Sequence, residues 1–130
     1  MYEYWATVVS VHDGDTVTLN VDLGFRTWRL AQHVRLAGIS ALELSMPGGI
    51  EAWGHLREIL PVGTRVALRS YKAEADPSDV MSFDRYVVMV RLPNGTDLAD
   101  RLVLDGYAVW WNGKTRPVPY PVWPIPGGVL

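Results

Sequence analysis

The segment VHDGDTVTLNVD at residues 11–22 decides the fold, because it joins a tight turn to a strand of alternating character. Val17, Leu19 and Val21 alternate with polar residues, as expected of a strand that buries one face. The β-branched and aromatic stretch from Tyr4 to Val11 precedes the turn. We therefore predict a hairpin around Asp13-Gly14, where glycine would tolerate the positive φ of a tight turn.

The later segments extend this hairpin into a small, mainly β domain. A third extended segment is expected from Thr27 to Ile39, in antiparallel meander order with the first two. Helical periodicity predicts a short helix from Ile50 to Leu60 that Pro61 ends. Three further elements are expected, namely a strand over Thr64–Tyr71, a strand over Tyr86–Val90 buried on both sides, and a helix over Asp97–Leu104 that Thr96 caps and Gly106 ends.

The C-terminal residues of the chain differ in composition from the rest. Residues 1–112 are predicted to form one domain, and residues 113–130 a proline-rich C-terminal tail that cannot be helical. The tail is either an extended strap laid on the domain or a mobile segment, and its apolar side chains favour partial docking. The polar stretch from Ala73 to Asp84 is expected to be an exposed loop.

Composition excludes several classes of protein. The chain has 130 residues, no cysteine and a net charge of −2, so disulfide frameworks, thiolate metal sites and bulk cationic coating of nucleic acid are disfavoured. No apolar run is long enough for a membrane span, and the first residues lack the features of a signal peptide. We expect a soluble, intracellular protein of the cytoplasm of a bacterium or a phage-infected cell, without a membrane partner.

Charged side chains stand at three positions where strand patterning favours apolar residues. Asp15 shares the parity of Val17 and Leu19, so its carboxylate is predicted to face inward at the mouth of that strand. Arg35 lies inside an apolar segment, and Arg85 opens another. Because isolated charges in such positions are costly, we expect them to meet each other, a carboxylate, a metal or a ligand.

Each of these residues alone has an ordinary structural interpretation. Asp13-Gly14-Asp15 is typical of a hairpin turn, a strand arginine commonly extends into solvent, and Glu43 suits any exposed loop. Together they meet the needs of phosphodiester hydrolysis. Arginines neutralise the phosphate, a glutamate takes a proton from water, and a metal held by carboxylates polarises phosphate or water.

Four segments resemble motifs of the staphylococcal nuclease (thermonuclease) family, in the same order and with similar spacing. Residues 11–17 resemble the family's Asp-Gly-Asp-Thr signature, and residues 34–43 its Arg-Leu segment followed by Asp-Thr/Ala-Pro-Glu. Residues 82–86 correspond to Tyr/Phe-Gly-Arg, and residues 102–108 to Leu-Val-x-x-Gly-x-Ala. The resemblance runs from about Tyr4 to Trp111 and implies a five-stranded OB-fold barrel with helices packed on it.

The resemblance also implies an activity and the residues that perform it. Glu43 would act as general base on the attacking water, while Arg35 and Arg85 would hold the phosphate and Arg85 would assist the leaving oxygen. Phe83 would contact the substrate. Family members cleave DNA or RNA and leave 3′-phosphate ends, so single-stranded or frayed DNA or RNA is the expected partner.

Ca²⁺ is the activating ion that the resemblance implies. Its carried-over ligands are the Asp15 carboxylate and the Ala41 backbone carbonyl, with Asp13 in a supporting position. Ser40 stands where the family has a second metal carboxylate, and a hydroxyl in that position should weaken the site.

Other departures from the family pattern affect the loops. Leu42 replaces the proline before the glutamate, and Asp84 replaces the glycine before Arg85, where its carboxylate can pair with the arginine. The proline-rich tail stands in place of the family's last helix.

Several other residues admit two interpretations. His12, His33 and His55 lack metal-ligand spacing and are interpreted as ordinary surface or core residues. Trp110-Trp111 can stack on bases or pack against the core or the tail. Basic residues outnumber glutamates in the middle of the chain, which indicates either a modest basic face or a solvated strand surface (Arg26, Arg29, Arg35, Arg57, Arg65, Arg69, Lys72).

Three functional hypotheses follow from the sequence. The leading one is a metal-assisted nuclease. The second is a non-catalytic OB-fold module that binds nucleic acid or protein and keeps a degenerate metal site. The third is a structural protein whose proline-rich tail docks in a groove of a partner.

Overall fold

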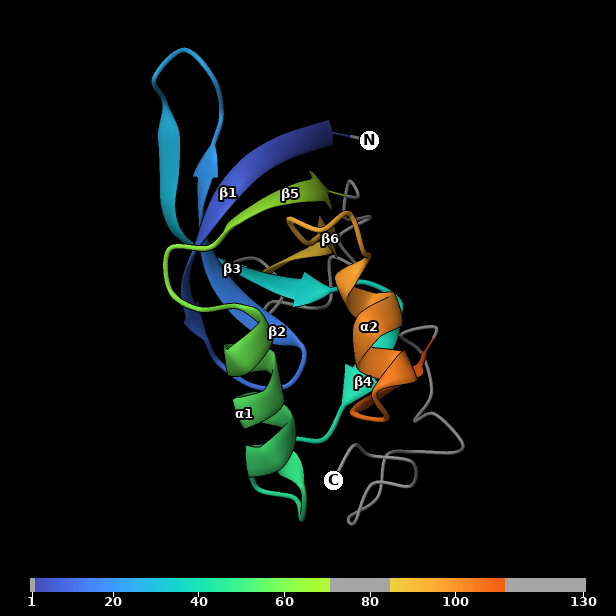
Figure 1. Cartoon of the computed structure of the whole chain (residues 1–130). Coiled ribbons are helices and arrows are strands. Elements are labelled where there is room, and N and C mark those ends of the chain that lie inside the picture. The colour runs from blue at the N-terminus through green and yellow to red at the C-terminus, as the bar shows by residue number, and fades with distance from the viewer. Residues whose placement is uncertain (1, 71–84, 112–130) are drawn as a thin grey trace, which may run out of the picture.

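Five strands close into a barrel in the order β1-β2-β3-β6-β5, which confirms the predicted mainly β, OB-fold-like class. The computed structural model describes residues 2–70 and 85–111 (Figure 1). All neighbouring barrel strands are antiparallel except β3 and β6, which are parallel. The strands of the barrel are β1 (Tyr2–Val11), β2 (Thr16–Asp22), β3 (Trp28–Leu36), β5 (Arg65–Ser70) and β6 (Arg85–Arg91).

The barrel interior is filled by the inward residues of every strand. Val17, Leu19, Val34, Val66 and Val88 are almost completely buried there. The alternation that the sequence shows in β2 is therefore the alternation between core and surface. Strand β6 differs from its prediction, because Val88 and Val90 are buried while Val87 and Met89 are only partly covered, so β6 buries one face and not two.

Two short helices lie outside the barrel, α1 (Gly49–Ile59) and α2 (Leu98–Leu104), close to their predicted ranges (Figure 1). The cap of α2 differs from the prediction: Asp97, and not Thr96, accepts a hydrogen bond from the Asp100 amide. Asp97 has the extended backbone that an N-cap needs, and its carboxylate also suits the positive end of the helix.

An ionic cluster connects α1 with the end of α2. His55 Nε2 and Arg101 Nε lie 2.7 and 2.8 Å from Asp105 Oδ2. The His55 ring stacks on Tyr107, with 4.2 Å between the ring centroids. Burial alone would raise the pKa of Asp105, but the hydrogen bonds and charges of Arg101 and His55 outweigh burial and lower it.

The predicted third extended segment is divided at Gly38. The chain turns there at φ 78°, which favours glycine, and continues as β4 (Ile39–Ala41) outside the barrel. There β4 pairs with β7 (Ala108–Trp110), a strand that sequence periodicity did not predict because it has only three residues. This small sheet brings the segment before Glu43 beside the end of the described chain.

Gly14 serves a different purpose from the one predicted. The φ angle of Gly14 is not positive, so the turn does not require glycine for its backbone conformation. A Cβ built on Gly14 would lie 2.7 Å from the Ala41 Cβ and 3.3 Å from the Ala52 Cβ. Glycine is thus needed because the turn packs closely against β4 and α1. This close approach positions the two aspartates that flank it.

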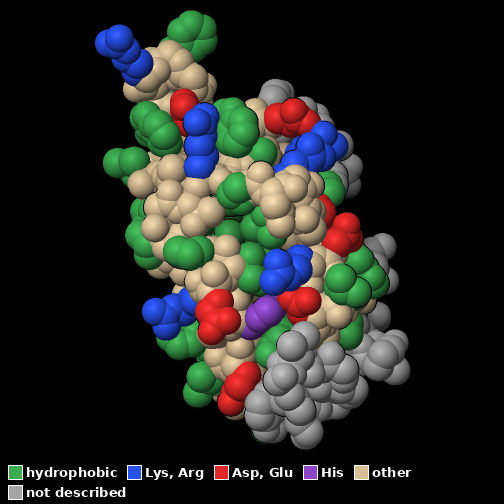
Figure 2. All heavy atoms as spheres, in the orientation of Figure 1, with side chains coloured by type: hydrophobic (Ala, Val, Ile, Leu, Met, Phe, Trp, Pro, Cys, Tyr) green, Lys and Arg blue, Asp and Glu red, His purple; other side chains and the backbone are tan. Residues whose placement is uncertain are grey.

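The β2–β3 hairpin extends beyond the barrel, at the top of the view in Figure 1. Its turn is closed by hydrogen bonds from the amide of Leu23 to the carbonyl of Thr27 and from the amide of Thr27 to the carbonyl of Gly24. Figure 2 shows hydrophobic and basic side chains together on this projection. Within the described residues, no helix is long and apolar enough to cross a membrane.

Candidate functional site

Asp15 lies at the mouth of the barrel with its carboxylate turned inward, as its strand parity predicted. The residue is 9% exposed. Its Oδ2 accepts a 3.0 Å hydrogen bond from the Ala41 amide, and its Oδ1 accepts one of 3.3 Å from the Thr16 hydroxyl. The Asp15 amide in turn donates to Asp13 Oδ1 at 3.0 Å, so both acidic side chains occupy one corner.

The ionised form of Asp15 is poorly stabilised in this corner. Burial is the main cause, and the hydrogen bond and negative charge of Asp13 add to it, so that the pKa of Asp15 rises from 3.8 to about 6. The Ala41 amide and the Arg35 charge act in the opposite direction without cancelling the effect. A carboxyl held in an unfavourable environment of this kind is typical of functional sites.

Arg35 reaches the same corner from the end of β3. Its Nη2 lies 3.6 Å from Asp15 Oδ2 and donates a 3.2 Å hydrogen bond to the Ile39 carbonyl. The indole of Trp111 covers the guanidinium, with 4.7 Å between Cζ and the ring centroid. Arg35 therefore meets a carboxylate, which is one of the partners that the sequence left open, and no other acceptor among the described residues binds its remaining N–H groups.

Glu43 lies in the loop between β4 and α1, where it is exposed to solvent. The loop is closed by hydrogen bonds from the Met46 amide to the Glu43 carbonyl and from the Gly49 amide to the Met46 carbonyl. A Cβ on Gly49 would lie only 1.8 Å from the Glu43 carbonyl oxygen. The start of α1 thus supports the backbone that carries Glu43.

The second predicted phosphate arginine begins β6, where the backbone of Arg85 is in register with His33 on β3. This register lies two residues from Arg35 along β3, so the fold brings the two arginine positions to neighbouring strands. The side chain of Arg85 lies outside the described part of the chain, as do Phe83, Asp84, the predicted loop over 73–84 and the predicted tail over 113–130.

The donors assigned to Ca²⁺ fit a weakly held ion better than a tightly held one. Asp13 and Asp15 place two carboxylates together, which a cation would relieve. Asp15 already accepts hydrogen bonds on both oxygens, however, and Ser40 is buried in β4 without a charge to offer. Among the described residues, no three histidines or carboxylates form a metal-binding group.

Sequence reasoning missed how three residues support this corner. Gly14 and Gly49 allow the close approaches that hold Asp15 and Glu43, whereas the sequence suggested only a turn for Gly14. For Trp111 the sequence predicts either stacking on bases or packing against the protein. In the structure its ring lies over Arg35, and its amide donates a 2.8 Å hydrogen bond to the Gly38 carbonyl. Only the β4–β7 pairing, which sequence spacing does not reveal, brings it there.

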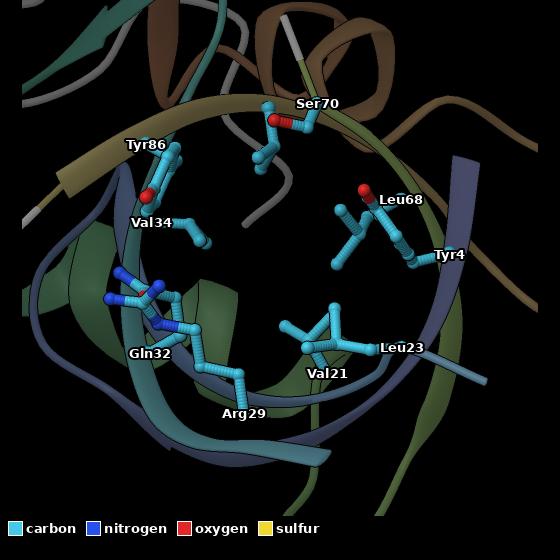
Figure 3. A pocket seen from close by; sticks show the side chains of 10 residues that line it. Tyr4, Val21, Leu23, Arg29, Gln32, Val34, Leu68, Ser70 and Tyr86 are labelled. Carbon is cyan, nitrogen blue, oxygen red and sulfur yellow. The ribbon is translucent and has the colours of Figure 1, made fainter. Parts of the chain in front are cut away.

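A hollow of about 190 Å³ opens at the other end of the barrel (Figure 3). Its walls are the aliphatic side chains of Val21, Val34 and Leu68, and Arg29 and Tyr86 stand at its rim. It lies beside the start of β3 and the end of β2, whereas Asp15 and Arg35 lie at the opposite ends of these strands. None of the predicted site residues whose side chains the structure describes lines it.

No protein-family model matches the sequence, and a search of curated proteins finds no relative. The functional interpretation therefore depends on the residues themselves.

Proposed function

We propose that the protein is a phosphodiesterase of the staphylococcal nuclease type that hydrolyses single-stranded or frayed DNA or RNA. One observation carries the proposal: the indole of Trp111 covers the guanidinium of Arg35, which lies 3.6 Å from the buried carboxyl of Asp15 and, among the described residues, donates a hydrogen bond only to the Ile39 carbonyl. A planar guanidinium held on one side in this way is suited to bidentate contact with two phosphate oxygens.

The reaction needs a base and a second cation near that phosphate. Glu43 follows β4 closely, and its exposed carboxylate is the nearest glutamate in sequence to the Ala41 segment that contacts Asp15. It would take a proton from water as the water attacks phosphorus. Arg35 and Arg85 would stabilise the charge on the phosphoryl oxygens, and Arg85 would assist departure of the 5′ oxygen, leaving a 3′-phosphate end.

A calcium ion belongs to this proposal in a limited role. Asp15 and Asp13 would hold it, with the Ala41 carbonyl as a further oxygen ligand, and water would fill the remaining positions. When bound, the ion would supply positive charge next to the phosphate. Ser40 removes one charged ligand, so we expect the ion to bind weakly.

The second candidate is a non-catalytic OB-fold module that binds nucleic acid or protein and has lost its ion. Two features around Asp15 favour it. Ser40 is buried and uncharged, and Arg35 lies 3.6 Å from the Asp15 carboxylate that a metal would use. In such a module Arg35 would neutralise Asp15 permanently.

Two measurements distinguish the candidates. Purified protein is incubated with end-labelled single-stranded DNA and RNA, with Ca²⁺ or with a chelator, and cleavage in either condition supports the phosphodiesterase. Calcium titration by calorimetry is performed on the wild type and on Ser40→Asp. A wild type that neither cleaves nor binds calcium, next to a variant that binds it, would favour the degenerate module.

A further inference from the structure

A groove of about 440 Å³ runs beside the Glu43 loop on the outer surface of the barrel. The loop and α1 form one wall, through Leu44, Ile50 and Trp53, while the outer faces of β1–β3 form the other. Leu44 directly follows Glu43, so the groove adjoins the loop that carries the proposed base. It is lined by Ser10, Val11, His12, Thr18, His33, Leu44, Ile50 and Trp53, and these described residues include no acid.

The wall on α1 offers flat and apolar surface to solvent. Leu44 is 41% exposed and Ile50 is 63% exposed. Trp53 is fixed by a 2.9 Å hydrogen bond from its Nε1 to the Val11 carbonyl. The guanidinium of Arg57 lies over its ring, 4.5 Å from the centroid. An aromatic ring fixed in position with a cation beside it suits a ligand that has both flat apolar rings and negative charge.

The opposite wall continues along β3 onto the projecting hairpin. His33 is exposed on β3, with its Nδ1 2.8 Å from the Thr18 hydroxyl. An irregularity at Ala31, which adopts φ 52°, changes the alternation of the strand. Trp28, Leu30 and His33 are all exposed to solvent along this strand. The exposed path therefore runs from the groove to the hairpin without a break in β3.

The tip of the hairpin has the same combination of side chains. Phe25 is fully exposed, Trp28 is 46% exposed, and the basic residue Arg26 lies between them in sequence. From Trp28 to Arg35 the chain covers seven residues, or about 23 Å at the rise of a β-strand. This length is sufficient for several nucleotides of an extended single strand.

We infer that this path, from the groove of Leu44, Ile50 and Trp53 to the hairpin residues Trp28 and Phe25, binds a single-stranded nucleic acid. Bases stack on the exposed rings and aliphatic side chains, and Arg57 and Arg26 face the phosphates. The inference rests on the proposed function in one respect, because it assigns to the path the strand that continues beyond the phosphate held by Arg35. A partner that needed apolar contact alone would gain nothing from these arginines.

The test is a binding measurement that does not depend on cleavage. A fluorescein-labelled 20-nucleotide oligothymidylate is titrated by anisotropy with Glu43→Gln and with the same protein carrying Trp28→Ala, Ile50→Ala or both. Both side chains are exposed, so the variants are expected to fold, and their melting curves check this. We expect Trp28→Ala to weaken binding at least fivefold, because one base loses its stacking ring. We expect Ile50→Ala to weaken binding by a smaller factor, because one base loses only an apolar contact. Leu104→Ala, at a residue 83% exposed on α2, is the matched control and should leave the affinity unchanged.

Unchanged oligothymidylate affinity in the double variant would overturn the inference. Two further measurements on the double variant would then identify the true partner of the surface. Loss of binding to anionic phosphatidylglycerol vesicles would indicate a membrane, and loss of a dimer in sedimentation would indicate a second copy of the chain. Cleavage of the same oligothymidylate by the wild type, with Ca²⁺ present, separates the two proposals. A wild type that fails to cleave it, while its binding still depends on Trp28 and Ile50, refutes the nuclease and supports the binding path.

Discussion

Replacing Asp15 by asparagine should make the protein more stable at neutral pH. The pKa of Asp15 is raised from 3.8 to about 6 by burial and by Asp13. Between these two values the unfolded chain ionises while the folded chain keeps its proton, so the free energy of unfolding falls as the pH rises. The difference corresponds to about 3 kcal/mol above pH 6, at 1.36 kcal/mol per pKa unit.

Asparagine mimics the protonated carboxyl. Its carbonyl oxygen can still accept from the Ala41 amide, and its NH₂ group can donate to Asp13. The pKa of about 6 already includes the attraction of Arg35, which lies 3.6 Å from Oδ2 in the wild type, so the pKa difference sets the upper limit of the gain, which should be about 1–3 kcal/mol at pH 7. The gain should vanish below about pH 4, where both states of the wild type are protonated.

The assay is urea denaturation followed by tryptophan fluorescence between pH 4 and pH 8. Glu58→Gln, at an exposed position of α1, is the control and should leave the pH profile unchanged. Added Ca²⁺ should raise the stability of the wild type at pH 7 and leave Asp15→Asn unaffected, because the ion needs the charged carboxylate. If Asp15→Asn is no more stable than the wild type at pH 7, and falls with pH in the same way, the account of this corner is wrong.

Three further predictions concern the site and the packing of the helices. Gly49→Ala should destabilise the protein by more than about 2 kcal/mol and abolish cleavage, because its Cβ would meet the Glu43 carbonyl. Gly54→Ala is the control in the same helix. Its Cβ would enter open space, so thermal melts should show a stability gain of up to about 1 kcal/mol. Asp105→Asn should lower the free energy of unfolding by about 1–3 kcal/mol at pH 7, because it weakens the hydrogen bond to His55. The difference between variant and wild type should disappear in acid, where the wild-type carboxylate is protonated. Equal melting temperatures of the two proteins at pH 7 would refute the role of this cluster. Arg35→Lys should lower kcat/KM about 100-fold with folding intact, since an ammonium cannot replace the planar fork; steady-state rates on single-stranded DNA measure it.

The barrel was predictable because its signals are local and repeated. The alternation of Val17, Leu19 and Val21 and the helical spacing from Ile50 onward place the elements within a residue or two of their observed ends. The β4–β7 pair was not predictable, because strands of three residues carry too little periodicity and their pairing joins segments far apart in the chain. The third strand was predicted too long for a similar reason, since one glycine at residue 38 ends it.

The sequence predicted several of the residues that come together at the candidate site, but it predicted only part of how they contact one another. Strand parity predicted the inward carboxylate of Asp15. The cost of an isolated charge predicted that Arg35 would find a partner, but it did not decide between a carboxylate, a metal and a ligand. Gly14 was misinterpreted, because a turn motif does not reveal that the space beside it is filled by Ala41 and Ala52. The contact of Trp111 with Arg35 depends on tertiary packing that no spacing rule contains.

The central claim is that Glu43 and Arg35 serve phosphodiester hydrolysis. Its most direct test compares the rate of cleavage of end-labelled single-stranded DNA and RNA by the wild type and by Glu43→Gln, with Ca²⁺ present and with the folding of both proteins confirmed by thermal melts. We expect the wild type to release 3′-phosphate ends and the variant to be at least about 100-fold slower, because the water then lacks its base. A wild type as inactive as Glu43→Gln, or a variant as fast as the wild type, would contradict the account.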